Sequence, residues 1–223
     1  AAVIVATVKA IQFHGGFTDA GGFGNLAKHI DNIRIFGINP IVAINRFDDD
    51  KEEDLKAVME FCRSIGTEAV VAEHYRHGGA GAKDLANAVI ASIDQQKNKK
   101  ISFAYPLNIP LAEKIEMLAK KMYGADGVDF DHSVVNDLKH FSECGFDTLP
   151  VCIAKTQMSL SDNAKLPGRP KNFRIAVNEL RISNGAGFVV VICGNITTMP
   201  GLPKVPAAAR IKVHPDGSVE GLS

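Results

Sequence analysis

The first eight residues constrain the fold more than any other segment of the chain. They form an unbroken apolar and β-branched run, and the chain then continues to His14-Gly15-Gly16. A run without polar alternation predicts a strand covered on both faces, as in the middle of a parallel sheet. Such a strand needs a neighbour on each side, and every neighbour that this chain offers lies downstream. We therefore expect the chain to be the C-terminal part of a longer protein.

The first hundred residues alternate between strand and helix patterns. The expected strands are residues 1–8, 40–44 and 69–72, and the expected helices end at Gly37, Gly66 and about Lys97. This β-α-β-α-β-α order predicts a parallel sheet with right-handed crossovers and helices on both faces. We assign residues 1–100 to the C-terminal part of a nucleotide-binding α/β domain.

The second half of the chain has a different pattern. We expect an amphipathic helix from Pro110 to Gly124 and a shorter helix capped by Ser133, with residues 126–131 as a turn between them. The expected strands are residues 151–154, 173–180 and 187–193, with a closing hairpin around Pro215-Asp216-Gly217. We assign residues 101–223 to a smaller α+β region.

Charge and hydropathy narrow the classes of function. The 25 Lys and Arg residues balance 25 Asp and Glu residues, so no net field draws the chain to nucleic acid or to anionic lipid. The longest late apolar run, residues 188–193, is far shorter than the ~20 residues of a membrane-spanning helix. We expect small-molecule ligands, and neither nucleic acid nor a membrane as partner. Four scattered cysteines predict thiols in a reducing compartment, the cytoplasm or alternatively an organelle.

Polar residues follow each of the first three expected strands. They include His14, Gly15 and Gly16 after the first strand, and Asn45, Arg46, Phe47 and Asp48 after the second. Because ligands bind beyond the carboxyl ends of parallel strands, these segments are expected to meet at one rim. Asn45 and Asp48 have groups that pair with the edge of a heterocycle, and Phe47 offers a stacking face. Equally, Asp48 and its two following aspartates suit the capping of a helix.

The segment His74-Tyr75-Arg76-His77 follows the third strand. Two histidines three residues apart would share a metal ion on a helix, but a segment between a strand and Gly78-Gly79 is not expected to be helical. We expect no metal site there, and a ring beside a cation suits a flat or anionic ligand better.

Other familiar sites are missing or ambiguous in the sequence. Gly78–Asp84 approaches a phosphate-binding loop without the hydroxyl that would hold Mg²⁺, and Asp126–Asp131 lacks the spacing of a calcium loop. Lys155-Thr156-Gln157, with the serines that follow, suits either contact with an anion or a solvated loop.

Several blocks together resemble the formate–tetrahydrofolate ligase family. The opening block is similar to a family signature and departs from it at Lys9, Ile11 and Gln12, where the family has Arg, Leu and Lys. The matching blocks are Val5–Gly16, Val42–Phe47, Tyr123–Gly127, Leu149–Gln157, Gly168–Pro170, Gly185–Phe188 and Met199–Pro206. These blocks cover nearly the whole chain and occur in the same order as in the family. Several ordered blocks are more specific evidence than any single motif.

The resemblance implies a P-loop NTPase-like parallel-sheet domain and an ATP-dependent ligase, usually a homo-oligomer. In the family's reaction, ATP with Mg²⁺ phosphorylates formate, and N10 of tetrahydrofolate then attacks the formyl phosphate. Some members also require a monovalent cation. The residues that match the folate platform are Phe47 and Tyr75, although the family often has Trp at the second position. By the same resemblance, the cleft is lined by His14, Gly15, Gly16, Asn45, Arg46 and Asp48, and Gly201, Leu202 and Pro203 lie near the nucleotide.

The family's phosphate-binding loop has no counterpart in this sequence. By the resemblance that loop lies upstream, so the catalytic residues are not assigned, and we expect this chain alone to be inactive. The segment between Gly16 and Phe23 is also shorter than in the family. One alternative is a non-catalytic folate- or nucleotide-binding or assembly module, and another is an unrelated nucleotide-binding enzyme.

Overall fold

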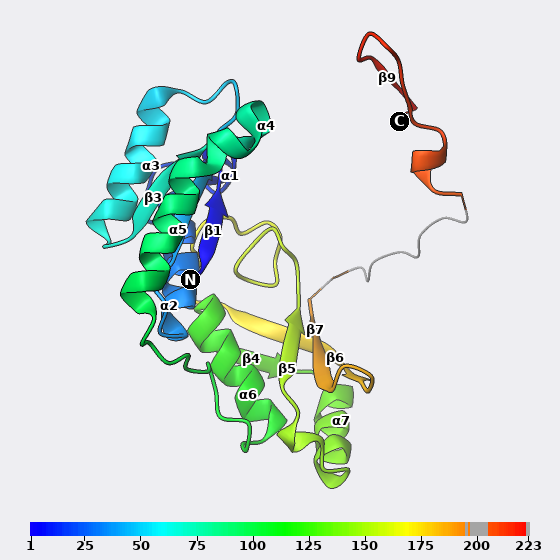
Figure 1. The fold of residues 1–223 in the computed structure, drawn as a ribbon. Helices are drawn as coiled ribbons and strands as arrows, with labels where there is room; N and C mark the ends of the chain where they lie inside the picture. The colour runs from blue at the N-terminus through cyan, green and yellow to red at the C-terminus, as the bar shows by residue number, and fades with distance from the viewer. Residues whose placement is uncertain (195, 197–204, 222–223) are drawn as a thin grey trace.

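The computed structural model describes residues 1–194, 196 and 205–221. These residues form a three-stranded sheet, a four-stranded sheet and a small two-stranded hairpin, with helices packed on the two larger sheets (Figure 1). The predicted α/β class is confirmed, whereas the domain boundary near residue 100 stays a prediction. No helix in the described part of the chain is long and apolar enough to cross a membrane.

The first sheet is parallel, with the order β1-β2-β3. Its strands are β1 Val3–Ala6, β2 Ile41–Asn45 and β3 Glu68–Ala72. The middle strand is β2, and among the described strands β1 pairs with β2 alone, so a second neighbour for the opening strand stays a prediction. Side chains on one face of β1 stay open, with Val3 41% and Val5 68% exposed. An apolar run predicts burial, but the packing of other elements decides which faces are covered.

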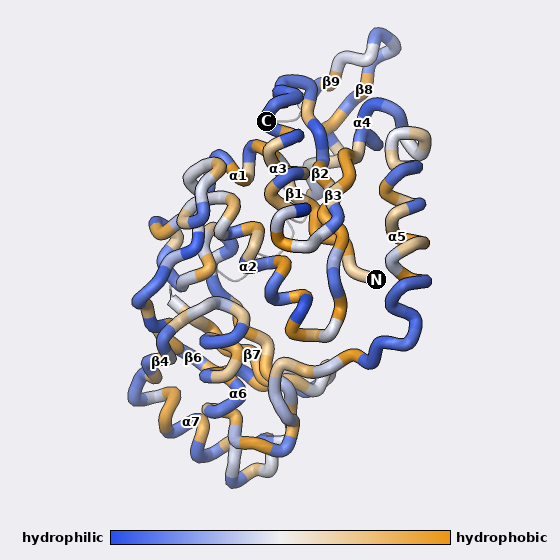
Figure 2. The backbone as a smooth tube through the Cα atoms, turned by 90° about the vertical axis from the view of Figure 1, so that its left-hand side faces the viewer, coloured by the Kyte–Doolittle hydropathy of each residue, from blue (hydrophilic) through white to orange (hydrophobic). Residues whose placement is uncertain are grey.

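Helices cover both faces of this sheet. They are α1 Val8–Phe13, α2 Gly22–Ile35, α3 Glu52–Ser64 and α5 Lys83–Gln96. Figure 2 shows α1, α2 and α3 on one side of the strands and α5 on the other, where it packs on β2 and β3. Only α1 was not predicted. The Oγ1 atom of Thr7 accepts a hydrogen bond from the Ala10 N–H at 2.9 Å, and this cap ends the strand and starts the helix.

The core of the first half lies between β2 and the helices on one side of the sheet. Its fully buried members come from three elements: Ile30 of α2, Val42 and Ile44 of β2, and Val58 and Cys62 of α3. These contacts hold the carboxyl ends of the strands, and the loops that follow them, in fixed positions.

The second sheet is mixed, with the order β4-β6-β7-β5. Its strands are β4 Gly127–Phe130, β5 Val151–Ala154, β6 Arg174–Ser183 and β7 Phe188–Cys193. Strands β6 and β7 are antiparallel, whereas β4 and β5 each run parallel to their neighbour. The predicted turn at residues 126–131 is wrong, because Val128 is buried and its strand pairs with β6.

Helices α6 Leu111–Leu118 and α7 His132–Glu143 pack on this sheet. A π-helical turn, Ala119–Tyr123, extends α6 to Gly124, which ends it in the left-handed conformation as expected. The residue at the N-cap of α7 is Asp131, so the predicted cap at Ser133 is wrong. Two short strands, β8 Lys212–Val213 and β9 Val219–Glu220, form the predicted hairpin.

Helix α2 joins the two halves through polar side chains. The amides of Asn25 and Asn32 donate to the carbonyls of Gly168 at 2.9 Å and Met122 at 2.8 Å. Next to them, Arg169 forms an ion pair with Asp31 at 3.3 Å. The loop that contains Gly168 is thereby held against the carboxyl-end edge of the first sheet.

Candidate functional site

The segments that follow β2 and β3 enclose a cavity of about 420 Å³. Its lining residues are Asn45, Arg46, Phe47, Asp48, Asp49, His74 and Tyr75. Five of the sequence-predicted site residues therefore share one cavity, although β2 and β3 are separated by the whole of α3. It lies beyond the carboxyl ends of the strands, where ligands bind in open parallel sheets.

The loop after β2 is a tight turn that presents Phe47. The Asp50 carboxylate accepts a hydrogen bond from the Phe47 N–H at 2.8 Å, and the Asp50 N–H donates back to the Phe47 carbonyl at 3.2 Å. Helix α3 begins after Lys51, where no side chain caps it. The alternative in which these aspartates serve as helix caps is therefore wrong, because Asp50 stabilises the turn that carries the aromatic ring.

Tyr75 lies on the short helix α4 His74–His77, which is followed by a 3₁₀ turn, Gly78–Ala82. The prediction that this segment would not be helical is wrong. A single turn forms because the Arg76 and His77 N–H groups both donate to the Glu73 carbonyl. The Tyr75 side chain is 87% exposed and Phe47 is 41% exposed, so both rings are open to a ligand.

One face of the Phe47 ring is covered by a cation that the sequence did not point to. The Nζ atom of Lys9, on α1, lies 4.6 Å from the ring centroid and 3.0 Å from an Asp49 carboxylate oxygen. The hydrogen bond from Lys9 lowers the pKa of Asp49. Lys9 is one of the positions where the chain departs from the family signature. Neither the sequence pattern nor the resemblance therefore predicted that Lys9 lies beside Phe47.

Ion pairs connect the loop that carries Phe47 with the helix that carries Tyr75. The Arg46 guanidinium bonds to Glu52 and lies 3.6 Å from Glu73, the residue before α4. Arg76 of α4 also pairs with Asp48 at 2.5 Å, a contact that raises the pKa of Arg76. The relative positions of the two rings thus depend on ion pairs between the two segments that carry them.

The segment His14-Gly15-Gly16 lies elsewhere. His14 ends α1 and lines another cavity, of about 290 Å³, while the two glycines form the turn that follows it with φ of +99° and +77°. Burial lowers the pKa of His14. Gly201, Leu202 and Pro203, and the Met199–Lys204 part of the last resemblance block, lie outside the described residues.

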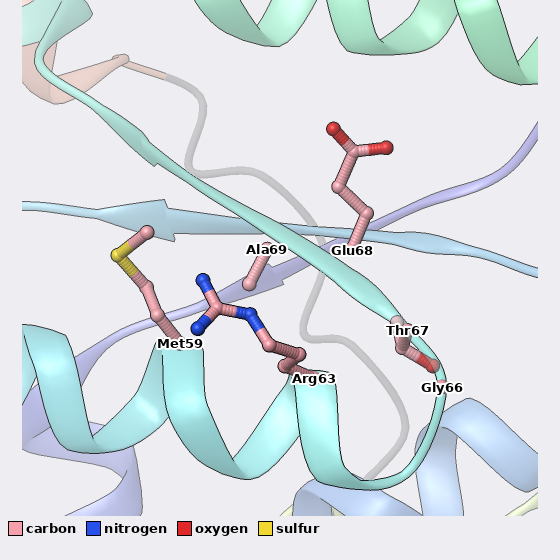
Figure 3. Close-up of a pocket in the computed structure, with 6 residues that line it drawn as sticks. All are labelled: Met59, Arg63, Gly66, Thr67, Glu68 and Ala69. Carbon is pink, nitrogen blue, oxygen red and sulfur yellow. The ribbon is translucent and has the colours of Figure 1, made fainter.

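A third cavity, of about 430 Å³, contains none of the predicted site residues (Figure 3). Met59 and Arg63 rise from α3 along the side of β3, and the turn at Gly66 and Thr67 closes one end. This cavity lies at the amino end of β3, opposite to the edge where ligands of parallel sheets bind. We therefore take the cavity with Phe47 and Tyr75 as the candidate functional site.

The described residues contain no group of three or more His, Cys, Asp or Glu side chains placed to hold a metal ion. His74 and His77 do lie on a helical turn, three residues apart. The candidate site consists of the two rings, the Asn45 amide and four ion pairs, which are those of Lys9 with Asp49, Arg46 with Glu52 and Glu73, and Arg76 with Asp48. Such a set recognises a flat molecule with a polar edge.

Comparison with known families gives an assignment for the chain as a whole. A family model described as formate–tetrahydrofolate ligase matches residues 1–223. The match includes both larger sheets and the candidate site, and it confirms the resemblance carried by the sequence blocks.

Proposed function

The chain belongs to the formate–tetrahydrofolate ligase family, and from this premise we propose that the cavity between Phe47 and Tyr75 binds the pterin ring of tetrahydrofolate. The observation that supports it is the meeting of two open aromatic side chains, one from the loop after β2 and one from α4, in one cavity of about 420 Å³ at the carboxyl edge of a parallel sheet. Aromatic stacking orients a flat heterocycle without fixing its chemistry. The carboxylates of Asp48 and Asp49, at the same cavity, would accept hydrogen bonds from the N–H edge of the pterin.

The reaction that we propose is the ATP-dependent ligation of formate to tetrahydrofolate. The γ-phosphoryl group of ATP passes to a formate oxygen, giving formyl phosphate and ADP. N10 of tetrahydrofolate then attacks the formyl carbon and phosphate leaves, which gives 10-formyltetrahydrofolate. Mg²⁺ would arrive on the phosphates of ATP and neutralise the transferring charge.

The phosphoryl-transfer residues are proposed to come from an upstream part of the same protein. The printed sequence holds no Gly-x-x-x-x-Gly-Lys-Ser/Thr segment, whose backbone N–H groups would cradle the phosphates. We therefore expect residues 1–223 alone to bind folate without turnover. The absence of this phosphate-binding segment from the sequence also favours a second candidate function, a non-catalytic folate-binding or assembly module. ATP consumption by the complete protein that requires both formate and tetrahydrofolate would exclude that candidate.

Replacing Phe47 or Tyr75 with alanine tests the folate platform. Each change is expected to weaken tetrahydrofolate binding by about 1–3 kcal/mol, by analogy with the stacking of bases on aromatic side chains. This corresponds to roughly 5- to 150-fold in Kd, measured by isothermal titration calorimetry. Phe103→Ala is the matched control, because Phe103 is 82% exposed and does not line the cavity. Unchanged affinity in both platform variants would place the pterin elsewhere.

Arg46→Gln tests whether the ion pairs set the spacing of the rings. The change removes the charge that Glu52 and Glu73 share, so Tyr75 and α4 lose one link to the Phe47 loop. We expect a loss of up to about 1 kcal/mol in folate affinity, the range of partly exposed ion pairs. Arg181→Gln, which breaks a surface pair with Glu179 on β6, serves as the control. Equal affinities in these two variants would contradict a positioning role for Arg46.

A further inference from the structure

The outer edge of β3 is open in the described part of the chain. Strand β3 pairs with β2 on one side and with no other described strand. The Arg46 N–H donates to the Ala72 carbonyl at 3.1 Å, so the backbone groups of Ala72 face β2. Because these groups alternate between the two sides of a strand, the N–H and C=O groups of Ala69 and Val71 face outward. An extended segment can form a ladder with these two residues.

The sequence of β3 does little to protect this edge. Edge strands are commonly blocked against further pairing by a lysine, a proline, a bulge or an inward-pointing charge. Strand β3, Glu68–Ala72, contains neither lysine nor proline, and its pairing with β2 is regular. Its one charged residue, Glu68, lies at the amino end of the strand. The remaining edge is apolar and open to pairing with a further strand.

The cavity of about 430 Å³ in Figure 3 lies beside this edge. Met59 and Arg63 reach from α3 towards β3, and the Ala69 side chain points to the same side of the strand (Figure 3). Glu68 also lines the cavity, but its side chain points to the other face of β3, away from α3. On the α3 side, the cavity is therefore lined by a thioether, a methyl group and a guanidinium.

Arg63 brings a positive charge to the cavity that no described carboxylate neutralises. Its side chain forms no ion pair within the described residues, although Glu60 lies three residues earlier on α3, and Glu52 of that helix pairs with Arg46 instead. Arg63 is exposed, so its guanidinium is accessible to a partner. A carboxylate is the group that a guanidinium binds best, often through two parallel hydrogen bonds. Charge complementarity therefore favours an acidic side chain on a segment that pairs with β3.

The spacing of the two α3 side chains matches that of side chains on one face of a strand. Met59 and Arg63 are four residues apart, which is about 6 Å along a helix axis. Alternate side chains of a strand lie on one face, about 6.6 Å apart. A segment paired with β3 can therefore place an apolar side chain against Met59 and Ala69, and an acidic side chain two residues away beside Arg63.

We propose that the outer edge of β3 binds an extended protein segment by strand addition, and that this segment has an acidic residue two positions from an apolar one. Main-chain pairing with Ala69 and Val71 supplies the affinity, and the side chains of Met59 and Arg63 select the sequence. The proposal goes beyond the folate platform and does not rest on it, because the two cavities share no lining residue.

The test is a fluorescence-anisotropy titration of a labelled peptide, Thr-Glu-Thr-Val-Thr-Glu-Thr, with the 223-residue chain. Its valine has a glutamate on each side, so either strand direction brings one of them to Arg63. We expect saturable binding. A peptide with glutamines in place of the glutamates should bind about two- to fivefold more weakly, the range of exposed ion pairs. A peptide methylated at its central amide nitrogens keeps its charge but should not bind, because it lacks the N–H groups that pair with β3.

Two variants of the chain test the role of Arg63. Arg63→Glu should raise the dissociation constant of the glutamate peptide at least about fivefold, because like charges then face each other. Lys139→Glu, the same reversal of charge at an exposed position of α7, is the control and should leave the dissociation constant unchanged. Phe47→Ala should also leave it unchanged, so failure of the folate platform and failure of this edge are separable.

Several results would overturn the proposal. They are the absence of saturation, equal binding of the methylated and unmethylated peptides, and equal weakening by Arg63→Glu and Lys139→Glu. Sedimentation velocity of the chain without peptide gives a further outcome. A dimer that Arg63→Glu dissociates would assign the edge of β3 to a second copy of the chain, and the proposal of a separate acidic segment would then be wrong.

Discussion

Gly168→Ala is expected to lower the free energy of unfolding by about 2–5 kcal/mol. Gly168 has φ of +76°, and an added Cβ would lie 2.4 Å from the Ala20 carbonyl oxygen and 3.0 Å from that of His14. The left-handed conformation costs an L-residue roughly 1–2 kcal/mol, and forced overpacking adds about 1–3 kcal/mol. Since both neighbours are backbone atoms, the loop has to move away from the segment that joins α1 to α2. Urea denaturation followed by circular dichroism measures the change.

Gly187→Ala separates strain from collision. Gly187 also has a left-handed φ, +71°, but an added Cβ would meet nothing within 4 Å. The Gly187→Ala variant should therefore lose only about 1–2 kcal/mol of unfolding free energy, the cost of the left-handed conformation. If both variants lose the same stability, the close approach between Gly168 and Ala20 contributes nothing. The Gly168 N–H donates to Nδ1 of His14 at 3.0 Å, so the Gly168 variant alone should also disturb the tautomer of His14, which histidine ¹⁵N spectra detect.

Ile30→Ala is the second change with a large expected effect. Ile30 lies on α2, is fully buried, and packs in the core with Val42, Ile44 and Val58. Truncation removes the burial of its side chain and leaves a cavity, which costs about 2–5 kcal/mol in comparable cores. The midpoint of urea unfolding should fall accordingly, with the slope of the transition unchanged.

Ile93→Ala is the matched control for that change. Ile93 lies on α5 and is 49% exposed, so the same atoms are removed from a site that already contacts water. Its cost should be within about 0.5 kcal/mol, as for most surface substitutions. A loss as large as that of Ile30→Ala would mean that the exposed face of α5 is covered in solution.

Elements with a clear hydrophobic period were predictable from the sequence. Helices α2, α3 and α5 and strands β2 and β3 follow from local spacing and from the glycines that end the helices. Three elements were missed for local reasons. Helix α1 starts inside an apolar run because Thr7 caps it, and α4 is a single turn between a strand and two glycines. Strand β4 contains Gly127 and Asp129, residue types that strands usually avoid.

At the candidate site, the meeting of Phe47 with Tyr75 followed from one rule, that the carboxyl ends of parallel strands share an edge. The partners of these residues did not follow. Lys9 reaches Phe47 from α1, and His14 receives its hydrogen bond from Gly168, 154 residues further along the chain. Pairings of this kind are set by tertiary packing, and no local pattern of residue types encodes them.

The position of α2 has a consequence for how the protein unfolds. One side of this helix belongs to the core of the first sheet through Ile30, and another is hydrogen-bonded to the second half through Asn25 and Asn32. Detaching either half would leave buried amides or apolar side chains of α2 exposed without compensation. The two sheets are thus expected to behave as one cooperative unit, with amide protons of β2 and β7 exchanging through the same global opening rather than through separate ones.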